Sequence, residues 1–447
     1  MSKTRRMTRR SAMQLAAAAT TLPLVHIRAA GAAGKLSISL WDHWVPGGTE
    51  AMRKQVADWA AKNKVEVTAD YTSQGPKLVM NAAAEAQAKA GHDFVPLLQW
   101  DSIAYSDHLE PVDDVIDYLV GKYGTYDPVV EYLAKSNGSW KVVPGTDPTA
   151  NLTCCARISM LKQYAGIDIT ELYPAHPTAP DHAKSWTYDT FLKAAEACHK
   201  AGFPFGMGLG STGDSVNNTG AIFSAYGADL VNAQGEITTK SDKVRQVMEY
   251  GQQLVKYLPP DTVSYDDASN NRALISGRSA LIYNPPSAWA VAKRDAPDVA
   301  KDCWTFPCPA GPVDRSIPYN YVFYGIWKFA KNKSAAKDLL RHLMEREQIE
   351  VRAIASEGFN LPPQLSMSDF KIWEEVEPPK GTVYNYPIRP WHGSKPSLVG
   401  YPAPPDIAVQ MYNRAIVPTM WAKLRSGQTV KQATDWATHE IEGFIRN

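Results

Sequence analysis

Residues 35–71 read KLSISLWDHWVPGGTEAMRKQVADWAAKNKVEVTADY, and this segment indicates the architecture of the chain. Residues 35–41 alternate apolar and polar side chains, as a β-strand does. A Gly- and Pro-containing loop over 42–48 leads to a segment in which apolar residues recur at helical spacing, and Thr49 can cap its start. Residues 65–71 form a second strand. The chain therefore opens with a strand–helix–strand unit.

The same alternation of strands and helices returns along the chain. Residues 94–99 form a short apolar strand of the kind that is buried on both faces, and 204–209 resemble a further strand. Residues 361–405 are crowded with Pro and aromatic residues and are expected to form a long ordered excursion over the surface. The pattern predicts an α/β fold with mostly parallel sheets. Helices are expected at 77–90, 188–199, 243–258, 334–355 and 429–445.

Length and composition indicate a two-domain globular protein. A chain of 447 residues is long enough to form two domains, each with its own core. Hydrophobic residues make up 44% and charged residues 21%, which is typical of globular chains. Lys and Arg total 47 against 46 Asp and Glu, so there is no strongly basic field to attract nucleic acid.

The first residues read as an export signal. Arginine pairs within 5–10 precede an apolar, Ala-rich run over 12–25, and small residues at 30–32 offer a cleavage site. Residues 8–14 resemble a twin-arginine signal, with a Sec signal as the alternative. The leader contains no Cys for lipid attachment. Residues 1–32 are therefore predicted to be removed, leaving a free protein in the periplasm.

Five cysteines say less about function. Cys303 and Cys308 could close a small loop in an oxidising compartment. Cys154 and Cys155 would point to opposite faces of a strand and cannot pair with each other without strain. Cys198 and one of that adjacent pair are expected to be buried free thiols. No second Cys or His stands at zinc-site spacing, so we predict no metal and no cofactor.

Eight short motifs then occur in a recognisable order. In that order they resemble family 1 of the extracellular solute-binding proteins, the maltose-binding-protein-like group of ABC importers. The likeness runs from Leu36 to Ile445, which is nearly the whole mature chain. The motifs are residues 37–41, 91–94, 109–114, 137–144, 185–191, 227–235, 276–281 and 306–312.

The resemblance implies two α/β lobes that close on a ligand like a hinge. It places the crossing segments near 148–152, 309–318 and 344–348. The lobes would then be 33–149 plus 309–345, and 150–308 plus 346–447. It further implies a monomeric periplasmic substrate-binding component that delivers a small polar ligand to the permease subunits of an ABC import system.

Candidate ligand-binding residues follow two of the predicted strands. Asp42 and Trp44 come directly after the first strand, and Trp100 and Asp101 after the third. Ligands of α/β sheets sit beyond the carboxyl ends of strands. An indole stacks on a sugar face while a carboxylate accepts hydrogen bonds from hydroxyls, so a sugar or polyol is the predicted ligand. The alternatives are packing roles for the rings and a helix cap for Asp101.

Further candidates come from the crossings and from the resemblance. Relatives supply a stacking ring from the loop that here holds Trp289. Strand alternation would turn Tyr319 and Tyr321 to one side, possible walls of the cleft. Trp391 belongs to the irregular segment and could form part of a lid, although packing against the body is the favoured role. The full candidate set is Asp42, Trp44, Trp100, Asp101, Asn151, Asn284, Trp289, Tyr319, Tyr321 and Trp391.

Two other classes of function remain open. An exported carbohydrate-active enzyme would need a pair of carboxylates about 5–10 Å apart. Asp42 and Asp101 could be neighbours, but no GxSxG, HExxH or P-loop pattern is present, so no catalytic residue is predicted. A binding protein for an amine or a metal chelate is the other alternative, because aromatic boxes hold quaternary amines. A metal group of Asp42, His43 and Asp101 is conceivable.

Overall fold

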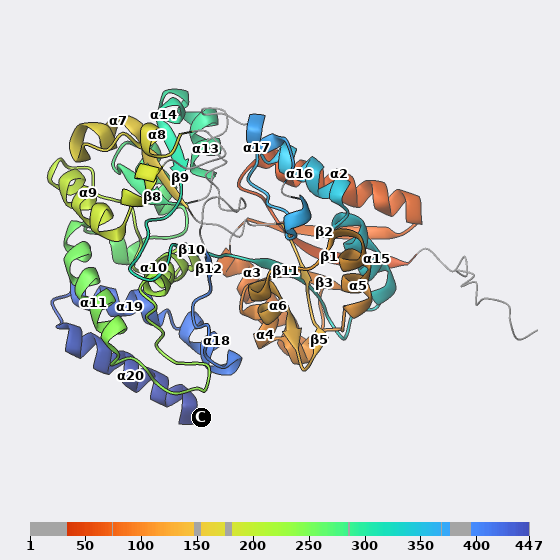
Figure 1. The fold of residues 1–447 in the computed structure, drawn as a ribbon. Coiled ribbons are helices and arrows are strands. Elements are labelled where there is room, and N and C mark those ends of the chain that lie inside the picture. Colours follow the sequence, from red (N-terminus) through yellow and green to blue (C-terminus); the bar gives the residue numbers. More distant parts are fainter. Residues whose placement is uncertain are drawn as a thin grey trace, which may run out of the picture.

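The computed structural model describes residues 34–73, 75–146, 153–174, 181–284, 287–367, 369–375 and 395–446. These residues form two lobes that lie side by side (Figure 1). The predicted export signal over 1–32 lies outside the described residues, as do two of the candidate site residues, Asn151 and Trp391. The two-lobed α/β fold predicted from the sequence is confirmed.

The first lobe is built on a five-stranded sheet. Its strand order is β2-β1-β3-β11-β6, and β1 pairs in parallel with both β2 and β3. The predicted strand–helix–strand opening is present, because α2 (Pro46–Asn63) connects β1 to β2. Leu36, Ile38 and Leu40 of β1 are buried in the core. The strands are β1 (Lys35–Trp41), β2 (Glu66–Thr72), β3 (Phe94–Leu98), β6 (Val143–Pro144) and β11 (Val322–Ile326).

Helices cover both faces of this sheet (Figure 1). Together with α2, the helices of this lobe are α3 (Gly75–Ala88), α4 (Asp101–Ala104), α5 (Asp113–Tyr123), α6 (Pro128–Ala134), α15 (Lys333–Leu343) and α16 (Arg346–Ala355), the last of which packs on α2. The hairpin β4 (Lys135–Ser136) and β5 (Ser139–Trp140) forms a separate two-stranded sheet. Arg352 of α16 donates to Gln55 of α2 at 2.6 Å. The predicted lobe boundaries stay a proposal, and this contact favours placing α16 with the first lobe.

The second lobe surrounds a three-stranded sheet of order β8-β7-β9. Its strands are β7 (Cys154–Arg157), β8 (Leu281–Tyr283) and β9 (Cys303–Phe306). The larger helices are α9 (Tyr188–Lys200), α10 (Gly213–Ala225), α11 (Asp242–Leu254), α13 (Ser287–Asp295), α18 (Pro405–Asn413), α19 (Ile416–Arg425) and α20 (Val430–Arg446). Shorter helices are α7 (Ile158–Met160), α8 (Ile169–Leu172), α12 (Ser269–Ile275) and α14 (Pro297–Lys301), while α17 (Ile372–Glu375) follows α16.

The sheets are mixed, which corrects the expectation of mostly parallel pairing. In the first lobe β11 is antiparallel to both of its neighbours, and in the second lobe β7 is antiparallel to both of its neighbours. Each of these strands comes next after a segment that arrives from the other lobe. Such a strand runs away from the lobe junction, whereas β1 and β3 run toward it. The parallel pair β10 (Ser316–Pro318) and β12 (Lys395–Ser397) forms a separate small sheet.

The cysteines are also arranged differently from the prediction. All five are buried thiols, and none of them is joined to another in a disulfide. Cys303 opens strand β9 and Cys308 lies beyond its end, so extended backbone holds these two apart. The register of β7 places Cys155 opposite Thr305, on the face that also carries Cys303. Cys154 lies beside Cys308, and burial and this neighbour raise its pKa well above the ordinary value.

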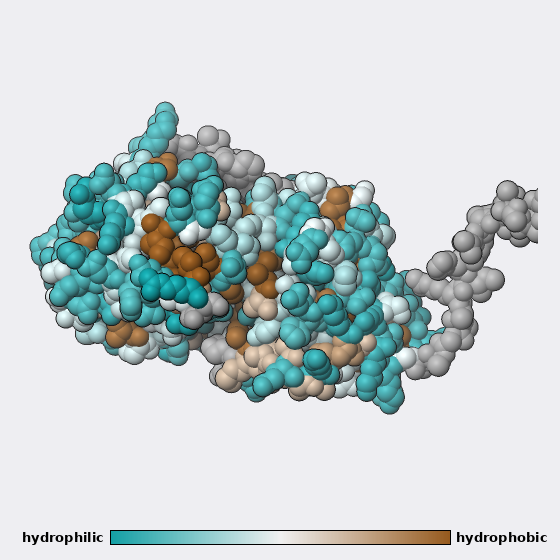
Figure 2. Space-filling view, turned by 90° about the horizontal axis from the view of Figure 1, so that it is seen from below, coloured by the Kyte–Doolittle hydropathy of each residue, from teal (hydrophilic) through white to brown (hydrophobic). Residues whose placement is uncertain are grey.

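The surface seen from below is mostly hydrophilic, and apolar residues gather in a few small patches (Figure 2). Among the helices in the described ranges, none combines the length and the apolar character needed to cross a bilayer.

Candidate functional site

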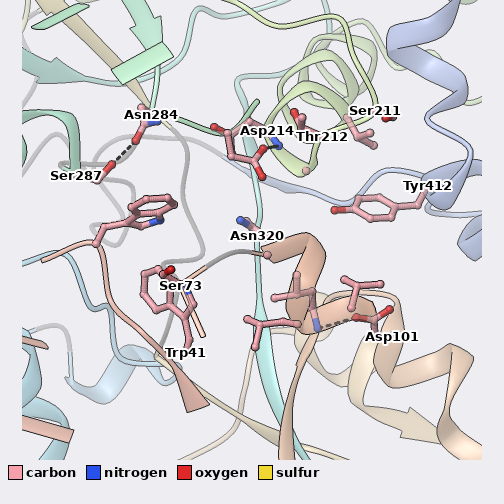
Figure 3. Close-up of a pocket in the computed structure, with 18 of the residues that line it drawn as sticks. Trp41, Ser73, Asp101, Ser211, Thr212, Asp214, Asn284, Ser287, Asn320 and Tyr412 are labelled. Atoms are coloured by element: carbon pink, nitrogen blue, oxygen red, sulfur yellow. Dashed lines mark hydrogen bonds between the residues drawn. The ribbon is translucent and has the colours of Figure 1, made fainter. Parts of the chain in front are cut away.

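A cavity of about 340 Å³ lies between the two lobes. One side is formed by the loop after β1, by α3 and by the end of β3. The other side is formed by the start of α10, by Asp267 and Asn271, by Asn284 and Ser287, and by the end of α18. In Figure 3 the side chains of the two lobes face each other across an open space.

The first lobe contributes an apolar wall to this cavity. Trp41 is the last residue of β1, and Trp44 follows in the loop with 39% of its surface exposed. Their rings meet edge to face with centroids 6.4 Å apart, and Phe359 lies 6.1 Å from Trp41. Large rings held at fixed angles can cover the apolar face of a ligand ring.

The loop that carries these rings is held by its own polar residues. The carboxylate of Asp42 accepts a hydrogen bond from Thr49 Oγ1 at 2.9 Å. His43 is buried between Trp41 and Phe359, and its Nδ1 accepts from the Val45 N–H at 2.8 Å. Burial lowers the pKa of His43 to about 3, so the ring is neutral at neutral pH. Asp42 and His43 thus shape the loop, and no metal-binding group is found in the described part of the chain.

The second lobe contributes a hydrogen-bonding wall. Thr212 caps α10 by accepting from the Ser215 N–H at 3.2 Å, which brings Asp214 to the cavity in the first turn. The Asp214 N–H donates to Asp267 Oδ1 at 3.3 Å. Burial and, after it, the neighbouring Asp267 raise the pKa of Asp214 well above its ordinary value. Burial also raises the pKa of Asp267.

A network of amides and hydroxyls continues this wall. Asn270 Nδ2 donates to Asp214 Oδ2 at 2.9 Å, and Asn284 Nδ2 donates to Asn270 Oδ1 at 3.0 Å. Ser287 Oγ donates to Asn284 Oδ1 at 2.5 Å, and Asn271 Nδ2 donates to Ser287 Oγ at 3.4 Å. Such a connected network holds its members in fixed orientations before a ligand arrives.

Asp101 and Tyr412 complete the cavity from opposite lobes. Asp101 begins α4, and its carboxylate accepts from the Leu98 N–H at 3.1 Å. Burial raises the pKa of Asp101 to about 7. Tyr412 belongs to α18, and its hydroxyl points into the space in Figure 3. Burial first, and then the carboxylates of Asp267 and Asp101, raise the pKa of Tyr412.

The structure brings three of the predicted residues to this cavity. Trp44 and Asp101, which follow the first and third strands, line it together with Asn284. Asp42 does not line it, because its carboxylate is turned to Thr49. Trp41, expected to belong to the core, is buried and also lines the cavity.

The other described candidates lie elsewhere. Trp100 is buried, and its Nε1 donates to the Val399 carbonyl at 3.1 Å. Trp289 is buried within α13 and is not among the lining residues. Tyr319 and Tyr321 pack on each other with ring centroids 5.1 Å apart. The alternation predicted for them holds, but Asn320 between them is the residue that reaches the cavity.

Several lining residues were not predicted. They come from segments of the second lobe that only the tertiary fold brings to the cleft. The local sequence signal for them was a Gly-rich stretch over 206–213, which is followed by polar residues inside a buried helix. The missed residues include Ser211, Thr212, Asp214, Asp267, Asn271 and Tyr412.

Comparisons with known proteins agree with this architecture. Three similar solved structures are the maltose-bound MalE3 of T. maritima, the GacH receptor of Streptomyces glaucescens and a sugar transporter of Arthrobacter chlorophenolicus with bound laminaribiose. MalE3 has a TM-score of 0.72 at 19% identity and covers 92% of this chain and 99% of its own. GacH has a TM-score of 0.68 at 16% identity and covers 93% of this chain and 98% of its own. The Arthrobacter protein has a TM-score of 0.69 at 15% identity and covers 92% of this chain and 99% of its own.

Among curated proteins no sequence matches this chain. A family model described as bacterial extracellular solute-binding protein matches residues 54–377. That match spans more than half of the chain and includes parts of both lobes. The chain belongs to the family of bacterial extracellular solute-binding proteins.

Proposed function

We propose that this chain is the periplasmic substrate-binding component of an ABC import system, and that it binds a sugar or polyol in the inter-lobe cleft. The observation that carries this proposal is the division of the cavity into a wall of rings from one lobe and a wall of hydrogen-bonding groups from the other. Neither wall alone would hold a small polar ligand, so binding requires both lobes.

The chemistry of the two walls suits a hydroxylated ring. The apolar face of a pyranose or cyclitol can lie on Trp41 and Trp44, because stacked rings bury C–H groups. Its hydroxyls can both donate and accept. They therefore match a wall that mixes the Asp214 and Asp267 carboxylates with Asn284 and Ser287.

Contacts between the lobes hold them against each other, and in our proposal the lobes close around the ligand. Tyr132 of α6 donates through its hydroxyl to the Ala403 carbonyl at 2.8 Å, and Trp100 donates to Val399. These bonds join the first lobe to the segment that follows β12. A permease that recognises only the closed form would accept the loaded protein over the empty one.

The similar structures support a carbohydrate as the ligand. Their descriptions name maltose, laminaribiose and acarbose, and a further one names a preference for β-D-galactopyranose. The leader over 1–32 supports export to the periplasm, by the twin-arginine route in our proposal, as a free monomer that reaches the permease subunits by diffusion.

The first experiment is thermal melting of the mature chain, residues 33–447, against a panel of sugars, polyols, amino acids, amines and metal ions. A ligand in large excess over its dissociation constant should raise the midpoint by several degrees, because it binds only the folded state. Each hit is then measured by calorimetry and incubated with the protein to look for chemical change.

The outcomes separate the classes of function. Stabilisation by one carbohydrate class, with the ligand recovered unchanged, supports the transport receptor. Consumption of the ligand would favour the exported carbohydrate-active enzyme, with Asp214 and Asp267 as the carboxylate pair to test. A response to metal ions alone, or to amines that carry no hydroxylated ring, would overturn the carbohydrate assignment.

A further inference from the structure

The cavity is acidic as well as aromatic. Asp101, Asp214 and Asp267 all line it, and the lining residues in the described part of the chain include no Lys, Arg or His. The neighbouring Asp266 shows the contrast, because it pairs with Arg272 at 2.7 Å. Across the described ranges, no such ion pair is formed by the three carboxylates of the cavity.

The polar wall of the cavity also offers a ligand many hydrogen-bond acceptors. Asn270 uses its amide donors on Asp214 and on the Tyr283 carbonyl, and Asn284 uses one of its two on Asn270. The hydroxyl proton of Ser287 is donated to Asn284. Asn271 Oδ1, in contrast, is a buried acceptor with no hydrogen-bond partner in the part of the chain that the structure describes. The carboxylates of Asp214 and Asp267 and the Asn271 oxygen therefore make this part of the wall rich in acceptors.

A neutral sugar would satisfy this wall only in part. Its hydroxyls can donate to the carboxylates, but the repulsion between Asp214 and Asp267 would remain. A protonated amine carries three donors, no acceptor and a positive charge. Placed between two carboxylates it would replace their repulsion with two charge-assisted hydrogen bonds. The rings of Trp41 and Trp44 across the cavity also tolerate a cation.

We propose that the ligand is an amino sugar or an aminocyclitol, whose ammonium group binds between Asp214 and Asp267 while its ring lies on Trp41 and Trp44. This inference rests on the proposed function, because it names the ligand class of the same cleft. It also unites two classes of ligand that the sequence left as alternatives, a hydroxylated ring and an amine.

Binding of such a ligand should depend on pH. Two titratable groups lie near Asp214, namely Asp267 from the loop before α12 and Tyr412 from α18. Asp101 of α4 lines the same cavity and lies near Tyr412, and the Asp266–Arg272 ion pair lies next to Asp267. The ammonium needs ionised carboxylates, whose pKa values are raised in the empty protein. Affinity should rise with pH until the amine itself loses its proton, whereas affinity for a neutral sugar should not rise.

The test uses matched pairs of ligands on the mature chain. Glucosamine is compared with glucose and N-acetylglucosamine, and galactosamine with galactose, by calorimetry between about pH 5 and pH 8. We expect each amino sugar, in its protonated form, to bind at least about tenfold more tightly than its neutral partners. Asp214→Asn and Asp267→Asn should each remove most of this preference.

The control variant is Asp229→Asn. Asp229 is another aspartate of the second lobe whose pKa is raised by burial, but it lies outside this cavity. This variant should keep the preference for the amine. The two cavity variants should melt no lower than the parent at neutral pH without ligand, because each removes a repulsion, and this result separates loss of binding from loss of folding.

The results distinguish this inference from the proposed function. Equal affinity for amino and neutral sugars, or an unchanged preference in both cavity variants, would overturn the amine and leave the carbohydrate receptor in place. Stabilisation by calcium chloride, abolished by EDTA and unaccompanied by binding of any amino sugar, would also overturn it. Failure of every carbohydrate, amino or neutral, would count against the proposed function itself.

Discussion

Gln99 Nε2 donates to Asn217 Oδ1 at 3.3 Å, and this bond joins the end of β3 in the first lobe to α10 in the second. Gln99 is fully buried and has a φ of 35°, in the left-handed region that side chains such as Gln rarely adopt. The same amide also donates to the Tyr319 carbonyl. Asn217 lies about one turn after Asp214, so the bond between the lobes stands directly behind the cavity.

Breaking this bond should weaken closure of the lobes. Asn217→Ala removes the acceptor without disturbing the helix, because Ala is a strong helix former. We expect the affinity for the best carbohydrate found in the panel to fall about 2- to 10-fold, the effect of one hydrogen bond. Calorimetry measures the loss, and small-angle scattering should show a larger radius of gyration. A double-mutant cycle with Gln99→Ala that finds no coupling would show that the bond does not contribute to closure.

The exposed ring of the cleft should matter for binding more than for stability. Trp44→Ala removes a side chain that is 39% exposed, so the free energy of unfolding should change by no more than about 1 kcal/mol. Loss of the stacking surface should lower affinity for the panel's best carbohydrate by about 10-fold or more.

The matched control is Trp289→Phe. Trp289 is buried outside the cavity, and its Nε1 has no hydrogen-bond partner among the described residues, so Phe loses volume but no bond. We expect lower stability in urea with unchanged affinity. A larger loss of affinity in this variant than in Trp44→Ala would place the stacking ring at Trp289 of α13 instead.

Part of the site could be predicted because a simple rule governs it. Ligands bind beyond the carboxyl ends of strands, and β1 and β3 were recognisable from their apolar patterns. Trp44 and Asp101 directly follow those strands, so both were predicted as candidates, and both line the cavity. The rule does not say which way each side chain turns, and so Asp42, which bonds to Thr49, and Trp100, which bonds to Val399, were included with them.

The polar wall of the second lobe could not be predicted in the same way. Asp214, Asp267 and Tyr412 are distant in sequence, and only the packing of α10, α12 and α18 brings them together. Strand direction was missed for a related reason. The hydrophobic pattern of β7 and β11 reports burial, whereas their direction depends on the lobe from which the chain arrives.

The stability of the empty protein should report the buried carboxylate of Asp101. Its folded pKa of about 7 lies above the ordinary value of 3.8, so its contribution to stability is present at low pH and is lost as pH rises from about 4 to about 7. Asp101→Asn can keep the hydrogen bond from Leu98 while removing this titration. Between about pH 5 and pH 8 the parent should lose roughly 2 kcal/mol more than the variant.

Comparing the free energy of unfolding of parent and variant at each pH separates the contribution of Asp101 from that of groups with the opposite pH dependence. His43, with a pKa lowered to about 3, contributes stability that is lost as pH falls below about 6.5, and this contribution is common to both proteins. Asp58→Asn, at an exposed surface position, should follow the parent curve. If the free energies of unfolding of the parent and of Asp101→Asn change equally between about pH 5 and pH 8, Asp101 ionises at low pH like an exposed carboxyl.

The thiols should be unreactive in the folded protein and unpaired after unfolding. All five cysteines are buried, and burial raises the pKa of Cys154 and of Cys198, the latter to about 11, so little thiolate forms at neutral pH. Iodoacetamide should leave the native chain almost unlabelled and should alkylate all five thiols in guanidinium without reductant. Mass spectrometry counts the adducts.

A count of three in the denaturant would mean that one disulfide exists. Peptide mapping would then distinguish a Cys303–Cys308 loop from the pairs that the β7–β9 register brings near each other, Cys155 with Cys303 and Cys154 with Cys308. The latter pairs would tie β7 to the β9 region and should raise the melting temperature under oxidising conditions, whereas a bridge spanning only the β9 strand would require that strand to leave the sheet.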